Sequence, residues 1–280
     1  MNTLLEDIRE MVQEQVQYRE LLWQMTRRDL MLRYKQTVMG FGWAIFSPLV
    51  NTLIFSVVFT RVAPLDVGIP YPVFAYAGLL AWNLSASALR FSVNSLTANI
   101  NLVAKVYFPR EIFPFSNVIV AGVDFAVGAV LLIAMMIYYR IPPTNALLCL
   151  PLVLVVQMIF TASIALFLAM GNLFYRDVKY LVEVAITVWM FATSVVYPMD
   201  RVTGVLGVVL KLNPMTPIID AYRRMLFYGQ WPDPIAFVGV AVASVALFAV
   251  AWVSFHRSEF QDRKSTRLNS SHTDISRMPA

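Results

Sequence analysis

Side chains able to perform catalysis are few in this sequence and do not form known catalytic patterns. The two histidines, His256 and His272, stand near the C-terminus and exclude a zinc-binding HExxH motif. None of the five lysines follows a glycine, which excludes the phosphate-binding loop GxxxxGK[ST], and the nucleophile motif GxSxG is absent. Cys149, the one cysteine, can form neither an internal disulfide nor a cysteine-based metal cluster. The chain is therefore predicted not to be an enzyme and to hold no metal or cofactor.

Three ionisable side chains, Arg90, Asp124 and Glu183, stand inside long apolar stretches. In a membrane such groups are costly, and they tend to face protein or water and to pair. Asp124 lies deepest and should be paired or protonated, and a structural bond explains it as well as a transport role does. Three groups are too few for a proton relay, so the sequence favours a passive path that is driven from outside.

The elements that must position these residues are membrane-spanning helices. The 280 residues are 59% hydrophobic and 14% charged, whereas soluble domains have roughly 25% charged residues. About 20 apolar residues in a helix cross a bilayer core of about 30 Å, and lipid offers backbone groups no other partner. We predict an all-α polytopic membrane protein with six transmembrane helices, at Gly40–Val62, Tyr71–Ser92, Phe115–Tyr139, Ala146–Met170, Tyr180–Tyr197 and Ile235–Phe255.

The distribution of basic residues orients the chain, because cytoplasmic loops retain positive charge. Most of the 22 lysines and arginines fall in segments on the same side as both termini. Both termini are therefore predicted to be cytoplasmic. The basic net charge reflects contact with membrane lipids, and no basic run indicates binding to nucleic acid.

The sequence predicts that the chain is divided into three regions. Residues 1–39 comprise a cytoplasmic amphipathic interfacial helix and a basic collar that meets lipid headgroups, formed by Arg27, Arg28, Arg33 and Lys35. Residues 40–255 form the membrane domain, with an inner loop at 93–114 and outer re-entrant half-helices at 198–234, broken between Asn213 and Pro217. Residues 256–280 form a cytoplasmic tail that is predicted to be disordered after Arg263, because it is Ser-rich and lacks an apolar period.

Two of the predicted spans carry mixed polar and aromatic faces. On the first span the residues are Trp43, Ser47, Asn51, Phe55 and Phe59, and on the fifth they are Glu183, Thr187, Trp189, Ser194 and Tyr197. Residues four apart share a helix face, and polar groups inside a span avoid lipid. These faces are candidates for a polar passage, and helix packing is the alternative for each residue.

Five stretches resemble a known family when they are taken in order. RDLMLRYKQTVMGFGWAIFSPL precedes and enters the first span, and the others are NLVAKVYFPREIFPFS, NLFYRDVKYL, VVYP and LNPMTPIIDAYRRML. The set resembles the permease subunit of type 2 ABC exporters that move polysaccharides such as O-antigen, capsule or teichoic acid chains. The resemblance covers Leu21 to Arg263. The stretch KSTRLNSSHTDISRMPA has no counterpart and is interpreted as a foreign extension without function.

The resemblance implies the partners of the chain. It implies a homodimer in the bacterial inner membrane, seated on a separate nucleotide-binding ATPase subunit that holds ATP and Mg²⁺. It also implies that the inner loops touch this ATPase and that the loop after the second span forms a coupling helix. The residues carried over for coupling are Asn101, Lys105, Tyr107, Phe108, Arg110, Glu111, Tyr175, Arg176 and Asp177.

The resemblance further implies that a lipid-linked polysaccharide crosses at the dimer interface between the first and fifth spans. Sugar rings stack their CH faces on aromatic rings and exchange hydrogen bonds through their hydroxyls, which suits the two mixed faces. One alternative is an exporter of a small molecule or drug with the same fold. A remote alternative is a glycan-modifying membrane enzyme, whose outer candidates Asp200, Asp220 and Asp233 lack a partner histidine.

Overall fold

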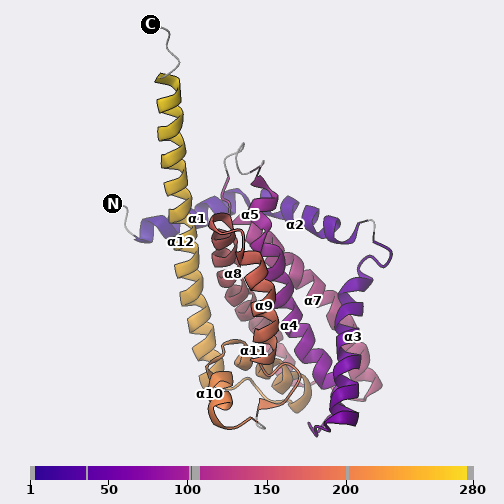
Figure 1. Cartoon of the computed structure of the whole chain (residues 1–280). Coiled ribbons are helices and arrows are strands. Elements are labelled where there is room, and N and C mark those ends of the chain that lie inside the picture. Colours follow the sequence, from indigo (N-terminus) through magenta and orange to yellow (C-terminus); the bar gives the residue numbers. More distant parts are fainter. Residues whose placement is uncertain (1–3, 36, 101, 103–107, 200–201, 276–280) are drawn as a thin grey trace.

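The described part of the chain folds as a bundle of long helices. The computed structural model describes residues 4–35, 37–100, 102, 108–199 and 202–275, and the regular elements in those ranges are all helices. In Figure 1 the long helices run side by side, α1 (Leu4–Gln17) and α2 (Arg19–Tyr34) lie across one end, and α10 (Gly204–Leu212) and α11 (Met215–Arg223) lie at the other.

Helix α4 (Tyr71–Val93) is the centre of the bundle and is buried along most of its length. It packs against α3 (Gly42–Val57), α7 (Ile112–Tyr138), α8 (Leu150–Phe174) and α9 (Val178–Phe191). The sequence of α4 is mostly apolar and rich in alanine, as suits a helix surrounded by other helices. The other helices are consequently held in place relative to α4.

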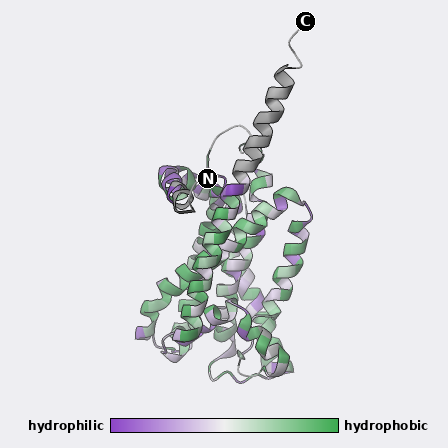
Figure 2. Ribbon diagram, turned by 90° about the vertical axis from the view of Figure 1, so that its left-hand side faces the viewer, coloured by the Kyte–Doolittle hydropathy of each residue, from purple (hydrophilic) through white to green (hydrophobic). Residues whose placement is uncertain are grey.

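Five helical stretches within the described residues are long and apolar enough to cross a membrane. They are Gly42–Val62, Tyr71–Val93, Ile112–Tyr138, Asn145–Phe174 and Pro234–Ser258. The first includes the π-helical turn η1 (Val58–Val62) and the fourth the short helix η2 (Asn145–Cys149). Figure 2 shows that hydrophobic residues predominate along the long helices. Large apolar side chains on them are exposed, including Leu53, Ile133 and Val242, which suits contact with lipid. The chain is a multi-pass membrane protein.

The segment expected as the fifth of six spans is shorter than predicted. Helix α9 ends at Phe191, not Tyr197, and its 14 residues extend about 21 Å. The chain then turns, with the Tyr197 hydroxyl donating to the Phe191 carbonyl at 2.6 Å. Asn213 Nδ2 donates to the Ala192 carbonyl at 2.7 Å, so a polar side chain from another segment replaces the next helical hydrogen bond.

The N-terminal region contains two helices where one amphipathic helix was expected. Helix α1 contacts α12 (Pro234–Ile275), and α2 packs on α7. Ser116 Oγ of α7 donates to Asp29 Oδ2 at 2.6 Å. Arg33 does not lie in the expected lipid-facing collar, because it turns inward to the carboxylate of Asp124. An acid in an apolar setting requires such a partner.

The two short helices expected between 198 and 234 correspond to α10 and α11, followed by the π-helical turn η4 (Arg224–Tyr228). The break falls at Asn213 and Pro214. Asn213 Oδ1 accepts from the backbone N–H of Met215 at 3.1 Å, as a residue that caps a new helix does. The break therefore has a local chemical cause.

Helix α12 continues to Ile275, although the sequence after Arg263 was expected to be disordered. No glycine or proline occurs between Gly239 and Pro279, so nothing in that stretch ends a helix that has already started. Figure 1 shows the last turns of α12 extending beyond the bundle at the α1–α2 end.

Candidate functional site

The open faces of α3 and α9 carry four of the predicted path residues. Trp43 and Ser47 of α3 are exposed, as are Glu183 and Thr187 of α9. Both helices contact the central helix α4, and several of their apolar side chains face outward as well. These two faces therefore offer exposed aromatic, hydroxyl and carboxylate groups that no other part of the described chain covers.

An ion pair links α9 to α4. Arg90 Nε donates to Glu183 Oε2 at 3.0 Å, and the two side chains are 42% and 57% exposed. The pair neutralises the Glu183 carboxylate, so this predicted path residue presents little net charge. Thr187 Oγ1 donates back to the Glu183 carbonyl at 3.0 Å, as hydroxyls in helices often do.

The remaining predicted path residues are packed to a greater degree. Phe55 and Phe59 are half-buried, and the Phe59 ring lies 5.5 Å from that of Tyr71. Trp189 packs edge-on against Trp82 and donates its Nε1 hydrogen to another segment. Asn51, Ser194 and Tyr197 are buried or half-buried. The packing alternative fits Trp189 and Ser194 better than a role on an open face.

A cavity of about 260 Å³ opens between α2, α3, α4 and α7, and Trp43 and Ser47 form part of its wall. Arg33 Nη1 donates to Ser87 Oγ at 3.2 Å and to the Asp124 carboxylate, which also accepts from the Tyr34 hydroxyl. Burial, followed by the hydrogen bond to Asp124, raises the pKa of Tyr34, which therefore stays a donor. Sequence reasoning found that Asp124 needs a partner but did not identify Arg33 or Tyr34.

The predicted coupling segment is described only in part. Asn101, Lys105 and Tyr107 lie outside the described residues. Phe108 is buried, with its ring 5.5 Å from the ring of Phe113, and Arg110 is half-buried.

Glu111 does not face outward as a coupling contact would. Its side chain is fully buried, and Trp252 Nε1 of α12 donates to its Oε1 at 3.1 Å. His256 Nδ1 lies 3.9 Å from the same oxygen. Glu111 immediately precedes α7, where its charge suits the helix N-terminus. Its position ties the start of α7 to α12.

The second predicted coupling loop joins α8 to α9, and its residues Tyr175, Arg176 and Asp177 are exposed. Asn172, at the end of α8, donates to Thr97 Oγ1 at 3.4 Å, so this loop lies beside α5 (Ser95–Ala98). The structure therefore brings α5, at the start of the first predicted coupling loop, and the α8–α9 loop to the same end of the bundle, where α1 and α2 also lie (Figure 1).

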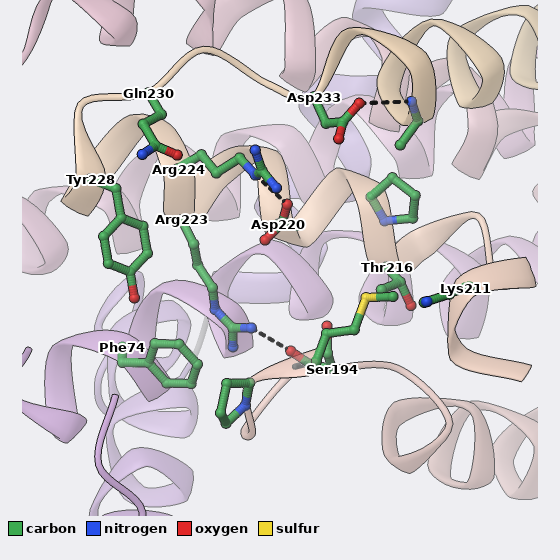
Figure 3. A pocket seen from close by; sticks show the side chains of 14 residues that line it. Phe74, Ser194, Lys211, Thr216, Asp220, Arg223, Arg224, Tyr228, Gln230 and Asp233 are labelled. Atoms are coloured by element: carbon green, nitrogen blue, oxygen red, sulfur yellow. Dashed lines mark hydrogen bonds and ion pairs between the residues drawn. The ribbon is translucent and has the colours of Figure 1, made fainter. Parts of the chain in front are cut away.

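A second cavity, of about 530 Å³, lies at the opposite end, beneath α10 and α11. Figure 3 shows Arg223 of α11 reaching from its helix toward Ser194 and Phe74. Arg223 donates to the carbonyls of Ser194 at 2.6 Å and Val195 at 2.5 Å, and its guanidinium stacks 3.7 Å from the ring centroid of Phe74. Burial lowers the pKa of Arg223 to about 10, so it remains charged at neutral pH.

Gly78 of α4 makes room for this arrangement. A Cβ atom at that position would lie 2.2 Å from the Val195 carbonyl oxygen and 2.8 Å from Arg223 Nη2. Two features were not inferred from the sequence: the hydrogen bonds from Arg223 to the carbonyls of Ser194 and Val195, and the close approach of the backbone at Gly78. The available signals were a glycine inside an apolar helix and an arginine in an apolar stretch.

Comparison with known proteins gives a consistent result. The profile of the family described as "ABC-2 type transporter" matches residues 20–227. The O-antigen export system permease protein RfbA of Myxococcus xanthus is 30% identical over 257 residues, which cover 90% of this chain and 98% of the relative. Two proteins of the same name from Klebsiella pneumoniae are 32% and 29% identical, over 75% and 81% of this chain and 81% and 90% of their own lengths.

Proposed function

The chain belongs to the ABC-2 type transporter family, and on that premise we propose that it is the transmembrane subunit of an ATP-driven polysaccharide exporter. One observation carries the proposal: the alignment with an O-antigen export permease includes 90% of this chain and 98% of that relative. The chain is thus a transport subunit and not an enzyme. Its cargo is a polysaccharide of the O-antigen type, carried on a lipid.

A separate ATPase subunit supplies the energy. Membership of this family implies such a partner, and the sequence lacks a phosphate-binding loop of its own. ATP and Mg²⁺ belong to that partner. The exposed residues Tyr175, Arg176 and Asp177, together with the inner loop that precedes α7, support a docking surface at the α1–α2 end. That end is cytoplasmic in our proposal, as are both termini, and the membrane is the bacterial inner membrane.

Two copies of the chain enclose the polysaccharide path. The open faces of α3 and α9 support this arrangement, because a second copy would cover them and Trp43, Ser47, Glu183 and Thr187 would line the interface. Helix α9 and the turn up to Tyr197 act together as the fifth of six spans. The helices α10 and α11 then close the outer end as re-entrant elements.

Polysaccharide is favoured over a small molecule or drug by the likeness to three O-antigen permeases and by the chemistry of the open faces. The combination of indole, hydroxyl and carboxylate groups suits a polyhydroxylated chain that must slide without a tight site. A drug exporter would be expected to bury its ligand in a largely apolar pocket.

The experiment that tests the function is deletion of the gene followed by complementation. Loss of surface polysaccharide with accumulation of the polymer inside the cell, restored by the full-length chain, is the expected result. Unchanged surface glycan in the deletion strain, together with altered resistance to a small toxic compound, would contradict the proposal and favour the drug exporter.

A further inference from the structure

The cavity beneath α10 and α11 contains two buried polar atoms without a described partner. These are Arg223 Nε and Thr216 Oγ1. The two residues are only 4% and 1% exposed, and both line the cavity. A buried donor left without a hydrogen bond is costly and is rare in native proteins. Two such atoms belong to residues that line this one cavity.

The lining of the cavity offers both hydrogen-bond donors and acceptors to a polar ligand. Lys211, Arg223 and Arg224 contribute positive charge, and Asp220 and Asp233 contribute negative charge. Arg224 Nε donates to Asp220 Oδ2 at 2.6 Å, so this cation is already paired. The two carboxylates can accept hydrogen bonds from the hydroxyl groups of a ligand.

Hydrogen bonds hold the carboxylates of Asp220 and Asp233 in position and occupy only part of their capacity to accept. Asp233 Oδ1 accepts from the backbone N–H groups of Ile235 at 3.0 Å and Ala236 at 3.3 Å, and these bonds hold it at the start of α12. The described bonds of Asp220 and Asp233 each use one oxygen of the carboxylate. Figure 3 shows both side chains among the residues that line the cavity. Gln230 adds an amide, and Tyr228 an aromatic ring.

We propose that this cavity binds a single sugar unit, with ring hydroxyls bonded to Arg223 Nε, Thr216 Oγ1 and the two carboxylates. Donors, acceptors and an aromatic ring together match a pyranose, and a volume of about 530 Å³ is within the usual range of ligand sites. The cavity lies at the end of the bundle opposite α1 and α2 (Figure 1). This inference rests on the proposed function, because the sugar would come from the polysaccharide as it leaves the exporter.

The test measures binding of free sugars to the full chain in lipid nanodiscs by saturation-transfer NMR. The probes are methyl α-mannopyranoside, methyl β-galactopyranoside, N-acetylglucosamine and inorganic phosphate. At least one sugar should bind the wild type, and Thr216→Val, which keeps the side-chain shape, should weaken that binding about fivefold. Thr60→Val is the matched control, since Thr60 lies on η1 outside the cavity and its hydroxyl donates to the Ser56 carbonyl; it should bind as the wild type does.

The outcomes separate this inference from the proposed function. Absence of binding by all three sugars, equal binding by the wild type and Thr216→Val, or binding of phosphate alone would each overturn the sugar site. Thermal unfolding of each variant shows whether it is folded, and Arg223→Lys is a second probe, expected to bind more weakly if it folds. Export of surface polysaccharide in complemented cells is scored separately, so the exporter assignment can stand when the sugar site fails.

Discussion

Arg33 of α2 and Asp124 of α7 form an ion pair across 91 positions of sequence. Their side chains are 12% and 17% exposed, and the Tyr34 hydroxyl donates to the same carboxylate. The guanidinium of Arg33 also stacks 3.9 Å from the ring centroid of Phe91 in α4. The pair therefore fastens the N-terminal helices to the membrane bundle, and the deepest acid of the sequence has a structural partner.

Replacing Asp124 by Asn should destabilise the protein by about 2–4 kcal/mol, because Arg33 would keep a buried charge without its counter-ion. Unfolding of the purified protein in detergent, followed by fluorescence, measures the loss. The double variant Arg33→Met, Asp124→Leu removes both charges and should recover most of the stability. A double variant as unstable as Asp124→Asn would show that the ion pair is not what the bundle depends on.

Arg110 and Glu111 should respond differently to charge reversal. Arg110→Glu should keep the fold and reduce the stimulation of ATP hydrolysis when the ATPase subunit is added, because Arg110 is half-buried in the loop proposed to dock there. Glu111→Lys should give little folded protein, since it places a cation in the buried site beside Trp252 and His256.

Yield on size-exclusion chromatography and ATPase activity distinguish the two effects. A well-folded Glu111→Lys variant with normal thermal stability would contradict the structural role given to Glu111. Full ATPase stimulation by Arg110→Glu would remove Arg110 from the coupling surface.

The length and apolarity of the helices could be predicted from sequence because they depend on local composition. Tyr71–Ser92 was expected as a span and α4 occupies Tyr71–Val93. The break near Asn213 was also foreseen, since proline and asparagine act on their immediate neighbours. These features need no knowledge of which helices touch.

The end of α9 and the placement of Glu111 could not be predicted, because distant residues decide them. Asn213 and Arg223 donate hydrogen bonds to the carbonyls of Ala192 and Ser194. In a longer α9 these carbonyls would accept from backbone N–H groups of the next turn. Glu111 looked like a surface charge in a polar loop, and only the packing of α12 against the start of α7 shows it to be buried. Tertiary bonds of this kind leave no periodic trace in a single sequence.

Gly78→Ala should disrupt the α10–α11 end of the bundle. The new Cβ would lie 2.2 Å from the backbone oxygen of Val195 and close to Arg223 Nη2. The turn after α9 and the Arg223 side chain bonded to it would therefore have to move. We expect a loss of about 1–3 kcal/mol, seen as earlier thermal unfolding. Gly239→Ala is the matched control, since no atom lies within 4 Å of its added Cβ. It should leave stability unchanged or raise it slightly, and equal effects of the two changes would contradict the steric account.

Cysteine cross-linking can test whether the open faces of α3 and α9 meet a second copy. Cys149 is the only native cysteine, so a Cys149→Ala background gives a clean starting point. In that background Ser47→Cys or Thr187→Cys should form disulfide-linked dimers in membranes on mild oxidation, because both positions are exposed on those faces. Val245→Cys on α12 is the control: its side chain is 56% exposed, but it lies on a helix expected to face lipid. Dimers formed through Val245→Cys and not through either α3 or α9 would place the interface on the wrong side of the bundle and displace the proposed path.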